Sequence, residues 1–525
     1  MISSFTNTRR FRAALFVCIL LTAAALRLVD LSRRPLHTDE AVHAVKFGRL
    51  LEQGMYQYDP IDYHGPSLVY STLLTARLSG RRTLTETTET TLRLVPAVFG
   101  LFLVAMTVFL RRYGSWATAF FAALLTAVSP AFVYYSRYYI MEMQLVVFAF
   151  AFLLALYRFT ETRSTLWAIA AGAAMGLMHA TKETCVLNWF AAGAALIVVD
   201  RSLFAKKELR STVGKIALGL LIGAIVSALF FSSFGKNPQG VIDSILSYKM
   251  YFQRGSGEAT AHAHPWFTYL KWLIWNRSAG RPLWTEGFIL LLGTVGAATA
   301  LFKPADRRHT FWRFIALYSV ILTVVYALLS YKTPWNLLSF FHGWVLPAGY
   351  GAATLMEKAL LRRRIVLTVL MFIGVVHLGW QAKALSLDYD TDASNPYVYA
   401  HTHRDIFKLT DAVGKLTHYS PLGNEEYIEV ICPGDDYWPL PWYLRHFKNV
   451  GYFSQVDMEL PTARLIIAMP EVQSDLVKKL YELPPPGQQH MYLPFFETGL
   501  LLRDGVEIDL FVRKDLWDEW YRNTP

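Results

Sequence analysis

The sequence is organised around residues 36–66, LHTDEAVHAVKFGRLLEQGMYQYDPIDYHGP, which follow the first strongly apolar segment. This stretch opens with two adjacent carboxylates, Asp39 and Glu40, and it closes with His64 before a glycine and a proline. Between these ends, apolar residues recur at helical spacing and charged residues take the opposite side. The pattern predicts an amphipathic helix on a membrane surface. A simple helix cap is the alternative explanation of the two carboxylates, because acidic residues stabilise a first turn.

The composition is that of a polytopic membrane protein. The 525 residues are 54% hydrophobic and 17% charged, whereas about a quarter of a soluble domain is charged. Apolar runs of about 20 residues are long enough to cross a bilayer as helices. About eleven transmembrane helices are predicted, near residues 11–31, 92–110, 116–133, a fourth with Glu142 near its start, 166–179, a sixth ending near 199, 216–234, 287–302, 314–330, 337–356 and 365–385.

Lysines and arginines concentrate in alternate loops of this arrangement. The bias places the N-terminus in the cytoplasm and the C-terminal region outside, in a multi-pass protein of the plasma (inner) membrane. The net charge of +11 follows from this bias, so a nucleic-acid partner is not expected. ATP hydrolysis has no support because no Gly-rich phosphate loop of the P-loop type is present. Three cysteines cannot build a disulfide framework.

From about residue 386 the composition changes to that of a soluble domain. Strands are predicted at 427–432 and 463–469, helices at 438–447 and 474–481, and a hairpin at 500–512 with Asp504-Gly505 in its turn. The chain is therefore expected to consist of a transmembrane domain, 1–385, and a small extracytoplasmic α/β domain, 386–525. The first outer loop, 32–90, belongs to the transmembrane domain in this interpretation.

Ionisable side chains gather at the predicted outer face. They are Asp39 and Glu40 after the first span, Arg137 and Glu142 between the third and fourth, Lys182 and Glu183 between the fifth and sixth, and Lys332 between the ninth and tenth. Charged groups at or inside a membrane are costly and usually functional. Carboxylates suit a base that deprotonates a hydroxyl, and cations suit a phosphate held at the membrane surface. The set predicts group transfer from a lipid phosphate.

Each of these groups also has a structural explanation. Arg137 suits a side chain that snorkels to the interface, and Glu142 suits an ion pair with that arginine. Lys182 and Lys332 suit anchors for lipid headgroups.

The histidines near these carboxylates suggest a metal. His37, His43 and His64 with Asp39 would make a plausible divalent site. Ordinary interfacial histidines are the alternative. The cofactor is left unknown, with a divalent metal as the candidate.

Several short motifs resemble, in their order along the chain, those of GT-C fold membrane glycosyltransferases. Thr38-Asp39-Glu40 resembles their acidic motif in the first loop, and Ser136-Arg137 with Glu142 resembles a second-loop pattern of an arginine and an acid five residues later. Residues 93–100 (RLVPAVFG) resemble the start of the second span, and 181–183 (TKE) and 332–335 (KTPW) resemble later motifs.

The chain is similar to the protein O-mannosyltransferase and aminoarabinose-transferase superfamily. It looks most like the prokaryotic branch named after a flippase-activity-associated glycosylation protein, and WPLPWYLR at 438–445 fits that branch. The resemblance implies an inverting transferase whose donor is a sugar on polyprenyl phosphate, bound from the outer leaflet. The acceptor, a hydroxyl on a protein, lipid or glycan, is not specified.

The resemblance also implies roles for individual residues. Asp39 would be the base that activates the acceptor hydroxyl, and Glu40 would help to position acceptor or donor. Arg137 would bind the donor phosphate. Glu142 stands where the family usually has Asp, so positioning and metal binding are both open for it, as they are for His43 and His64. Charge alone adds two further phosphate contacts, Lys182 and Lys332.

Two other classes of function are alternatives to the enzyme. The chain would be a transporter or accessory protein in lipid-linked sugar flipping, or a scaffold whose soluble domain recruits other proteins. A flippase should line a path across the bilayer with polar groups, whereas the ionisable residues here cluster at one face. A scaffold would not require Asp39 or Arg137.

Overall fold

The computed structural model describes residues 9–61, 64–200, 206–256, 262–303, 307–357 and 359–523, and it divides into two compact units. The first, here the helical unit, comprises Met1–Leu31, Gln53–Ser79 and Thr90–Tyr399. The second, here the sheet unit, comprises Ser32–Glu52, Gly80–Glu89 and Ala400–Pro525. Part of the first outer loop is thus grouped with the C-terminal residues. The predicted domain limits, 1–385 and 386–525, stay a prediction.

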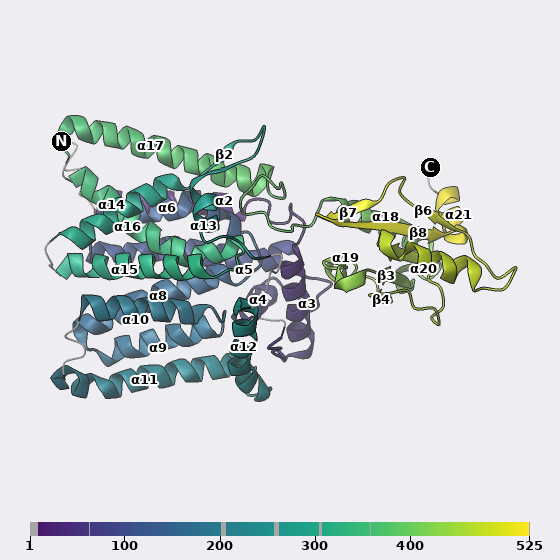
Figure 1. Ribbon diagram of the computed structural model, residues 1–525, viewed down its shortest axis with the longest axis horizontal. Helices are drawn as coiled ribbons and strands as arrows, with labels where there is room; N and C mark the ends of the chain where they lie inside the picture. The colour runs from purple at the N-terminus through teal and green to yellow at the C-terminus, as the bar shows by residue number, and fades with distance from the viewer. Residues whose placement is uncertain are drawn as a thin grey trace. The chain divides into compact units, whose positions relative to one another are not determined.

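The helical unit is built from helices joined by short connections. They are α2 (Arg9–Leu28), α4 (Ser67–Leu78), α5 (Glu89–Met106), α6 (Trp116–Val128), α7 (Pro130–Tyr135), α8 (Glu142–Thr162), α9 (Thr165–His179), α10 (Cys185–Val199), α11 (Lys206–Phe231), α12 (Gln239–Ser256), α13 (Thr268–Ile274), α14 (Gly287–Phe302), α15 (Arg307–Leu328), α16 (Leu337–Glu357) and α17 (Leu361–Lys383). Two short strands, β1 (Asn276–Arg277) and β2 (Leu283–Trp284), pair after α13. Helices α8, α9, α10 and α11 run side by side (Figure 1).

Helices occur at all eleven positions where spans were predicted. In the described residues, six segments are long and apolar enough to cross a membrane: Arg9–Leu28, Glu89–Arg112, Glu142–Thr162, Thr212–Phe231, His309–Leu328 and Leu361–Asp388. Four shorter apolar helices, α6, α9, α10 and α14, accompany them. The number of eleven membrane spans stays a prediction.

Glycines bring neighbouring helices of this unit close together. A β-carbon at Gly172 in α9 would lie 1.9 Å from the carbonyl oxygen of Gly219 in α11. A β-carbon at Gly296 in α14 would lie 1.9 Å from the carbonyl oxygen of Pro347 in α16. Small residues allow such backbone approach between membrane helices, where dispersion contacts drive association. The helix spacing therefore depends on having no side chain at these positions.

Cationic side chains bind the carboxyl ends of several helices. Arg27 donates hydrogen bonds to the carbonyls of Thr126 and Ala127 at the end of α6, at 2.9 and 2.8 Å. Arg313 donates to the carbonyl of Ala300 near the end of α14, at 2.9 Å. Lys215 donates to the carbonyl of Arg163, just past α8, at 2.7 Å. The last carbonyls of a helix have no partner within the helix, so a cation satisfies and neutralises them.

The sheet unit contains helix α3 (Thr38–Gln53) and a six-stranded mixed sheet. The strands are β3 (Ile428–Ile431), β4 (Val450–Phe453), β5 (Leu465–Ala468), β6 (Tyr492–Pro494), β7 (Leu500–Arg503) and β8 (Val506–Arg513). Their order is β4-β3-β5-β8-β6, with β7 paired to β8. The first three strands of that order are parallel, and β8 is antiparallel to its neighbours. The remaining helices are α18 (Asp405–Tyr419), α19 (Leu440–Tyr443), α20 (Gln473–Val477) and α21 (Lys514–Asn523).

The sheet unit agrees with the α/β pattern that its sequence predicts. Every residue of β3 and β5 is buried, as parallel strands covered on both faces should be. The hairpin of β7 and β8 forms as predicted, with Gly505 in its turn at a φ of 77°. The helix predicted over 438–447 was too long. Only Leu440–Tyr443 is helical, and Pro439 and Pro441 stand at its start, where a missing N–H is tolerated.

Replacing Gly172 with alanine should destabilise the helical unit by about 1–3 kcal/mol, because the added methyl group overlaps a backbone carbonyl that cannot move freely. Thermal unfolding in detergent measures the effect. Gly193→Ala in α10 is the matched control, because a β-carbon there meets nothing within 4 Å. Its stability should be unchanged or raised by up to about 1 kcal/mol. Equal losses in both variants would contradict close packing at Gly172.

Candidate functional site

The turn between α9 and α10 collects side chains from other parts of the helical unit. Lys182 Nζ lies 2.5 Å from Oε1 of Glu142, the first residue of α8, and donates a hydrogen bond to Asn336 Oδ1 at 3.0 Å. Lys182 and Glu142 are 5% and 3% exposed. Helices α8 and α10 begin, and α9 ends, at these residues, so successive antiparallel helices bring the groups to one end. Sequence analysis predicted both charged residues but not their pairing with each other.

The Lys182–Glu142 pair leaves hydrogen-bonding capacity unused. An ammonium group has three N–H donors, and among the described residues Lys182 uses two of them, on Glu142 and Asn336. Oε2 of Glu142 is buried and has no hydrogen-bond partner in the described part of the chain. Burial by itself lowers the pKa of Lys182, but the adjacent Glu142 carboxylate outweighs it and raises that pKa. The lysine therefore stays charged.

A second pair, His64 and Glu183, adjoins this turn. His64 Nδ1 lies 2.7 Å from Glu183 Oε2, and the Tyr58 hydroxyl donates to Glu183 Oε1 at 3.2 Å. Burial alone raises the pKa of Glu183, but the neighbouring His64 lowers it below its ordinary value. The carboxylate therefore stays ionised and orients the imidazole ring. Glu183 had been predicted among the ionisable residues of the outer face, but without a role of its own in the site.

Gly65 makes this arrangement sterically possible. Its N–H donates to the carbonyl of Thr181 at 3.1 Å, and a β-carbon on it would lie 2.3 Å from the backbone of Ala180. The histidine, glycine and proline at 64–66 thus dock directly on the α9–α10 turn. The glycine in this motif was the available sequence signal for such close backbone approach.

Arg137 is buried against the carboxyl end of α2. Its guanidinium donates to the carbonyls of Val29 and Asp30 at 2.5 and 3.1 Å. Arg93 of α5 donates to the next carbonyl, that of Leu31, at 2.8 Å. A cation placed there satisfies helix-end carbonyls. The alternative of an Arg137–Glu142 ion pair is wrong, because the carboxylate pairs with Lys182 instead.

The motif RLVPAVFG at 93–100 ends in a glycine that packs closely against Ser136 and Arg27, near the carboxyl end of α2. A β-carbon on Gly100 would lie 2.2 Å from Ser136 Oγ and 3.0 Å from Arg27 Nε. Arg27 itself donates to that serine hydroxyl at 3.2 Å. Sequence analysis missed Arg27, because an arginine inside an apolar run gives no sign of its partners.

Lys332 also binds the carboxyl end of a helix. Its ammonium group donates to the carbonyls of Ala327 and Leu329 at the end of α15, the first at 3.0 Å. It lies 5.7 Å from the centre of the Tyr269 ring, within reach of a cation–π contact. The phosphate-binding roles of Arg137, Lys182 and Lys332 stay predictions, and two of these cations have helix-end carbonyls as partners.

Asp39 and Glu40 lie in the first turn of α3, in the sheet unit. Glu40 Oε2 accepts the backbone N–H of His37 at 3.0 Å and pairs with Arg34 at 3.2 Å. His37 Nδ1 in turn accepts the N–H of Asp39 at 3.0 Å. This reciprocal pattern resembles a capping box, with histidine in the usual place of serine or threonine and with the backbone N–H of the second helical residue, not the third, bound to its side chain. Glu40 therefore caps the helix, as the simpler interpretation predicted.

The carboxylate of Asp39 is left outside the cap. Its side chain is 42% exposed, and its charged neighbour among the described residues is His37, 3.9 Å away. That contact is weak, because the facing imidazole nitrogen already accepts a backbone N–H. The two adjacent carboxylates thus have different environments. Glu40 is buried and paired with Arg34, whereas the side chain of Asp39 is exposed.

No group of three or more His, Cys, Asp or Glu side chains in the described residues is arranged to hold a metal ion. His43 lies half-buried on α3 in the sheet unit, and His64 pairs with Glu183 in the helical unit. A metal role for either histidine stays a prediction. The three cysteines are free thiols.

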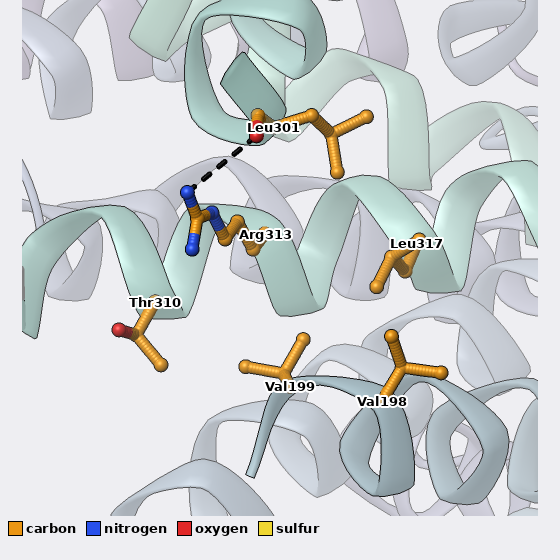
Figure 2. Close-up of a pocket in the computed structure, with 6 residues that line it drawn as sticks. All are labelled: Val198, Val199, Leu301, Thr310, Arg313 and Leu317. Carbon is orange, nitrogen blue, oxygen red and sulfur yellow. Dashed lines mark hydrogen bonds between the residues drawn. The ribbon is translucent and has the colours of Figure 1, made fainter. Parts of the chain in front are cut away.

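A cavity of about 260 Å³ lies at the other end of the helical unit (Figure 2). It is lined by Val198 and Val199 of α10, Leu301 of α14, and Thr310, Arg313 and Leu317 of α15. Arg313 already donates to helix-end carbonyls, one of them on Leu301. Its described lining residues include no carboxylate or histidine, and they lie at the opposite ends of α10 and α15 from the turn around Lys182 and from Lys332.

Comparison with known proteins gives a consistent picture of the fold. The family model of the dolichyl-phosphate-mannose-protein mannosyltransferases matches residues 74–230. A search of curated proteins found no match. The structure of ArnT from Cupriavidus metallidurans bound to undecaprenyl phosphate is 16% identical, covers 96% of this chain and 98% of its own, and superposes with a TM-score of 0.63.

Two structures of an oligosaccharyltransferase from Archaeoglobus fulgidus are also similar. The one tethered to an acceptor peptide is 12% identical, with a TM-score of 0.59 over 85% of this chain and 64% of that protein. The one in complex with an inhibitory peptide and a dolichol-phosphate is 12% identical, with a TM-score of 0.57 over 88% and 70%. This chain therefore spans about two thirds of the oligosaccharyltransferase.

These similarities confirm the resemblance to GT-C fold glycosyltransferases, whereas the narrower branch stays a prediction. The helices and the neighbouring folds together describe a multi-pass membrane protein. Glycosyltransferase is the enzyme class that the family model and the similar structures have in common. The chain is accordingly a membrane protein of the GT-C glycosyltransferase fold.

Proposed function

We propose that this protein transfers a sugar from a polyprenyl-phosphate donor to a hydroxyl acceptor at the extracytoplasmic face of the membrane, with inversion. The carrier class is supported by the undecaprenyl phosphate bound to ArnT and the dolichol-phosphate bound to the oligosaccharyltransferase. The proposed face follows from the cations in alternate loops. The acceptor is a hydroxyl of a protein, lipid or glycan.

The proposed reaction is a single displacement. The acceptor oxygen forms a bond to the anomeric carbon while the bond from that carbon to the phosphate oxygen breaks. The acceptor proton passes to a carboxylate, and polyprenyl phosphate leaves with the electron pair. Attack opposite the leaving group inverts the configuration of the carbon. The protein must therefore supply a free carboxylate as a base and a positive charge for the departing phosphate.

The proposal rests mainly on the difference between Asp39 and Glu40, of which only Asp39 has a carboxylate available to a substrate. Glu40 is engaged by Arg34 and by a backbone N–H, so it is poorly suited to accept a substrate proton. Asp39 is exposed, and its carboxylate is not used by the helix cap. We assign the base to Asp39. The role of Glu40 becomes support of the turn that carries Asp39, which refines its predicted role in positioning acceptor or donor.

Lys182 is our candidate for the positive charge at the phosphate. Glu142 and Asn336 hold its ammonium group, and its third N–H lacks a partner in the described residues. A phosphate oxygen would complete this set of hydrogen bonds. Arg137 and Lys332 retain predicted phosphate roles, but their helix-end contacts make them weaker candidates. His64, oriented by Glu183, would position the donor.

The second candidate function is an accessory role in lipid-linked sugar flipping. It would use the same lipid without needing a base. The transferase is favoured over this alternative because the paired ionisable residues gather at one turn of the helical unit, whereas flipping needs polar groups along a path across the bilayer.

Asp39→Asn should lower transfer by about 10²–10⁴-fold, the usual contribution of a positioned base. The measurement is release of free polyprenyl phosphate by the purified protein in vesicles made from lipid extracts of cells that produce it. Asp411→Asn is the control, because that aspartate is 62% exposed on α18 and pairs only with Lys415 in the described residues. Full activity of Asp39→Asn, with normal membrane insertion, would remove Asp39 as the base.

Breaking the Lys182–Glu142 pair should separate its structural part from its functional part. Lys182→Met leaves a buried carboxylate uncompensated and should cost about 3–5 kcal/mol of stability. Adding Glu142→Leu should recover much of that loss, because it removes the stranded charge. Thermal unfolding measures both. Transfer should stay low in the stable double variant if Lys182 binds phosphate, whereas recovery of transfer with stability would show a purely structural pair.

A further inference from the structure

We propose that two hydroxyl groups of the C-terminal region, on Tyr443 and Thr402, are positioning residues for Asp39. The inference rests on the proposed function, in which Asp39 is the base. Both residues belong to the sheet unit, as does the turn that carries Asp39. They hold the backbone of Leu36, the residue just before the cap of α3, and so determine where the first turn of that helix points.

Both backbone groups of Leu36 are bound by side chains far along the sequence. Its N–H donates to the Tyr443 hydroxyl at 2.8 Å, and its carbonyl accepts from Thr402 Oγ1 at 2.7 Å. Leu36 is completely buried. A buried backbone group that loses its partner costs the free energy of its desolvation. These two contacts therefore fix the extended segment that leads into the helix.

The residues that make these contacts are themselves supported. Thr402 forms an isolated β-bridge with Arg503, the last residue of β7. Arg503 donates to the carbonyl of Trp438 at 2.7 Å and pairs with Asp436. Its guanidinium also reaches Thr38 Oγ1 at 3.5 Å, on the first residue of α3. The first-loop turn is thus held against the hairpin and the WPLPWYLR motif.

The WPLPWYLR motif also binds a second part of the first outer loop. Trp442 Nε1 donates to Glu89 Oε1 at 2.9 Å, and Arg445 donates to the carbonyl of Thr87 at 3.0 Å. Arg445 also stacks 3.7 Å from the centre of the Trp442 ring. Tyr443 lies between these two anchors in the sequence. Within the sheet unit, the motif therefore anchors the loop that bears Asp39.

The link from Leu36 to Asp39 runs through the cap. His37 follows Leu36, its carbonyl accepts the N–H of Ala41 at 2.9 Å, and its ring nitrogen accepts the N–H of Asp39. Rotation of the backbone at Leu36 would therefore turn the cap and redirect the Asp39 carboxylate. Small displacements of a base have large effects on rate, because proton transfer requires hydrogen-bond distance.

The double variant Tyr443→Phe/Thr402→Val tests this inference in the full-length protein. It should lower kcat about tenfold, corresponding to about 1.4 kcal/mol, with a donor KM within about twofold of wild type. The probe is the polyprenyl-phosphate fraction of the cell lipid extract. Hydrogen exchange of the peptide spanning 34–41 should become faster, while exchange in β3 and β5 stays unchanged.

The controls remove the same chemical groups elsewhere in the sheet unit. Tyr419→Phe removes a hydroxyl that donates to the carbonyl of Asn523, and Thr417→Val removes one bonded within α18. Both should keep wild-type kcat. Wild-type kcat in Tyr443→Phe/Thr402→Val, or faster exchange throughout the sheet in that variant, would overturn the inference.

A comparison with Asp39→Asn separates the inference from the proposed function. An inactive Asp39→Asn beside a fully active Tyr443→Phe/Thr402→Val would overturn only the positioning role. A fully active Asp39→Asn would overturn the base assignment, and the positioning role with it. If both hold, adding the double substitution to Asp39→Asn should reduce the residual rate no further, because groups that act through one residue are not additive.

Discussion

The helical unit depends on cationic side chains that bind the carboxyl ends of its helices, and three of them, Arg27, Arg137 and Lys332, are buried. Arg27, Arg137, Arg313 and Lys332 each donate to carbonyls at or next to a helix end, and Lys215 does so just past α8. Lipid cannot satisfy such carbonyls, and each one left unpaired costs several kcal/mol. A cation that replaces the missing hydrogen bonds also offsets the helix dipole. The bundle can therefore use helices that end inside the protein.

This constraint changes how charges near a membrane face are interpreted. Lys182 differs from Arg137 and Lys332 because its partners are a carboxylate and an amide, and not helix carbonyls. The Lys182–Glu142 pair and the His64–Glu183 pair meet at one turn, where Gly65 allows the first outer loop to dock. That turn therefore carries two buried carboxylates, each paired with a basic side chain.

Much of the architecture was predictable from sequence, because apolar length and alternating polarity directly reflect burial. The helices of the bundle, the amphipathic helix after the first span and the β7–β8 hairpin all follow such patterns. The partners of charged side chains were not predictable in this way. Arg137 and Glu142 are five residues apart yet bind different elements, because the choice of partner depends on which helix ends meet. The capping role of Glu40 was predictable from its position, whereas its pairing with Arg34 required the fold.

Mass spectrometry of the lipid that remains bound to the purified wild-type protein tests most directly whether the sugar donor is a polyprenyl phosphate. Extraction in native membrane discs, followed by lipid analysis of the folded fraction, gives the identity of carrier and sugar together. We expect a polyprenyl phosphate or its glycosylated form, enriched over the surrounding membrane. A folded preparation without any such lipid, which also fails to bind added undecaprenyl phosphate, would contradict it.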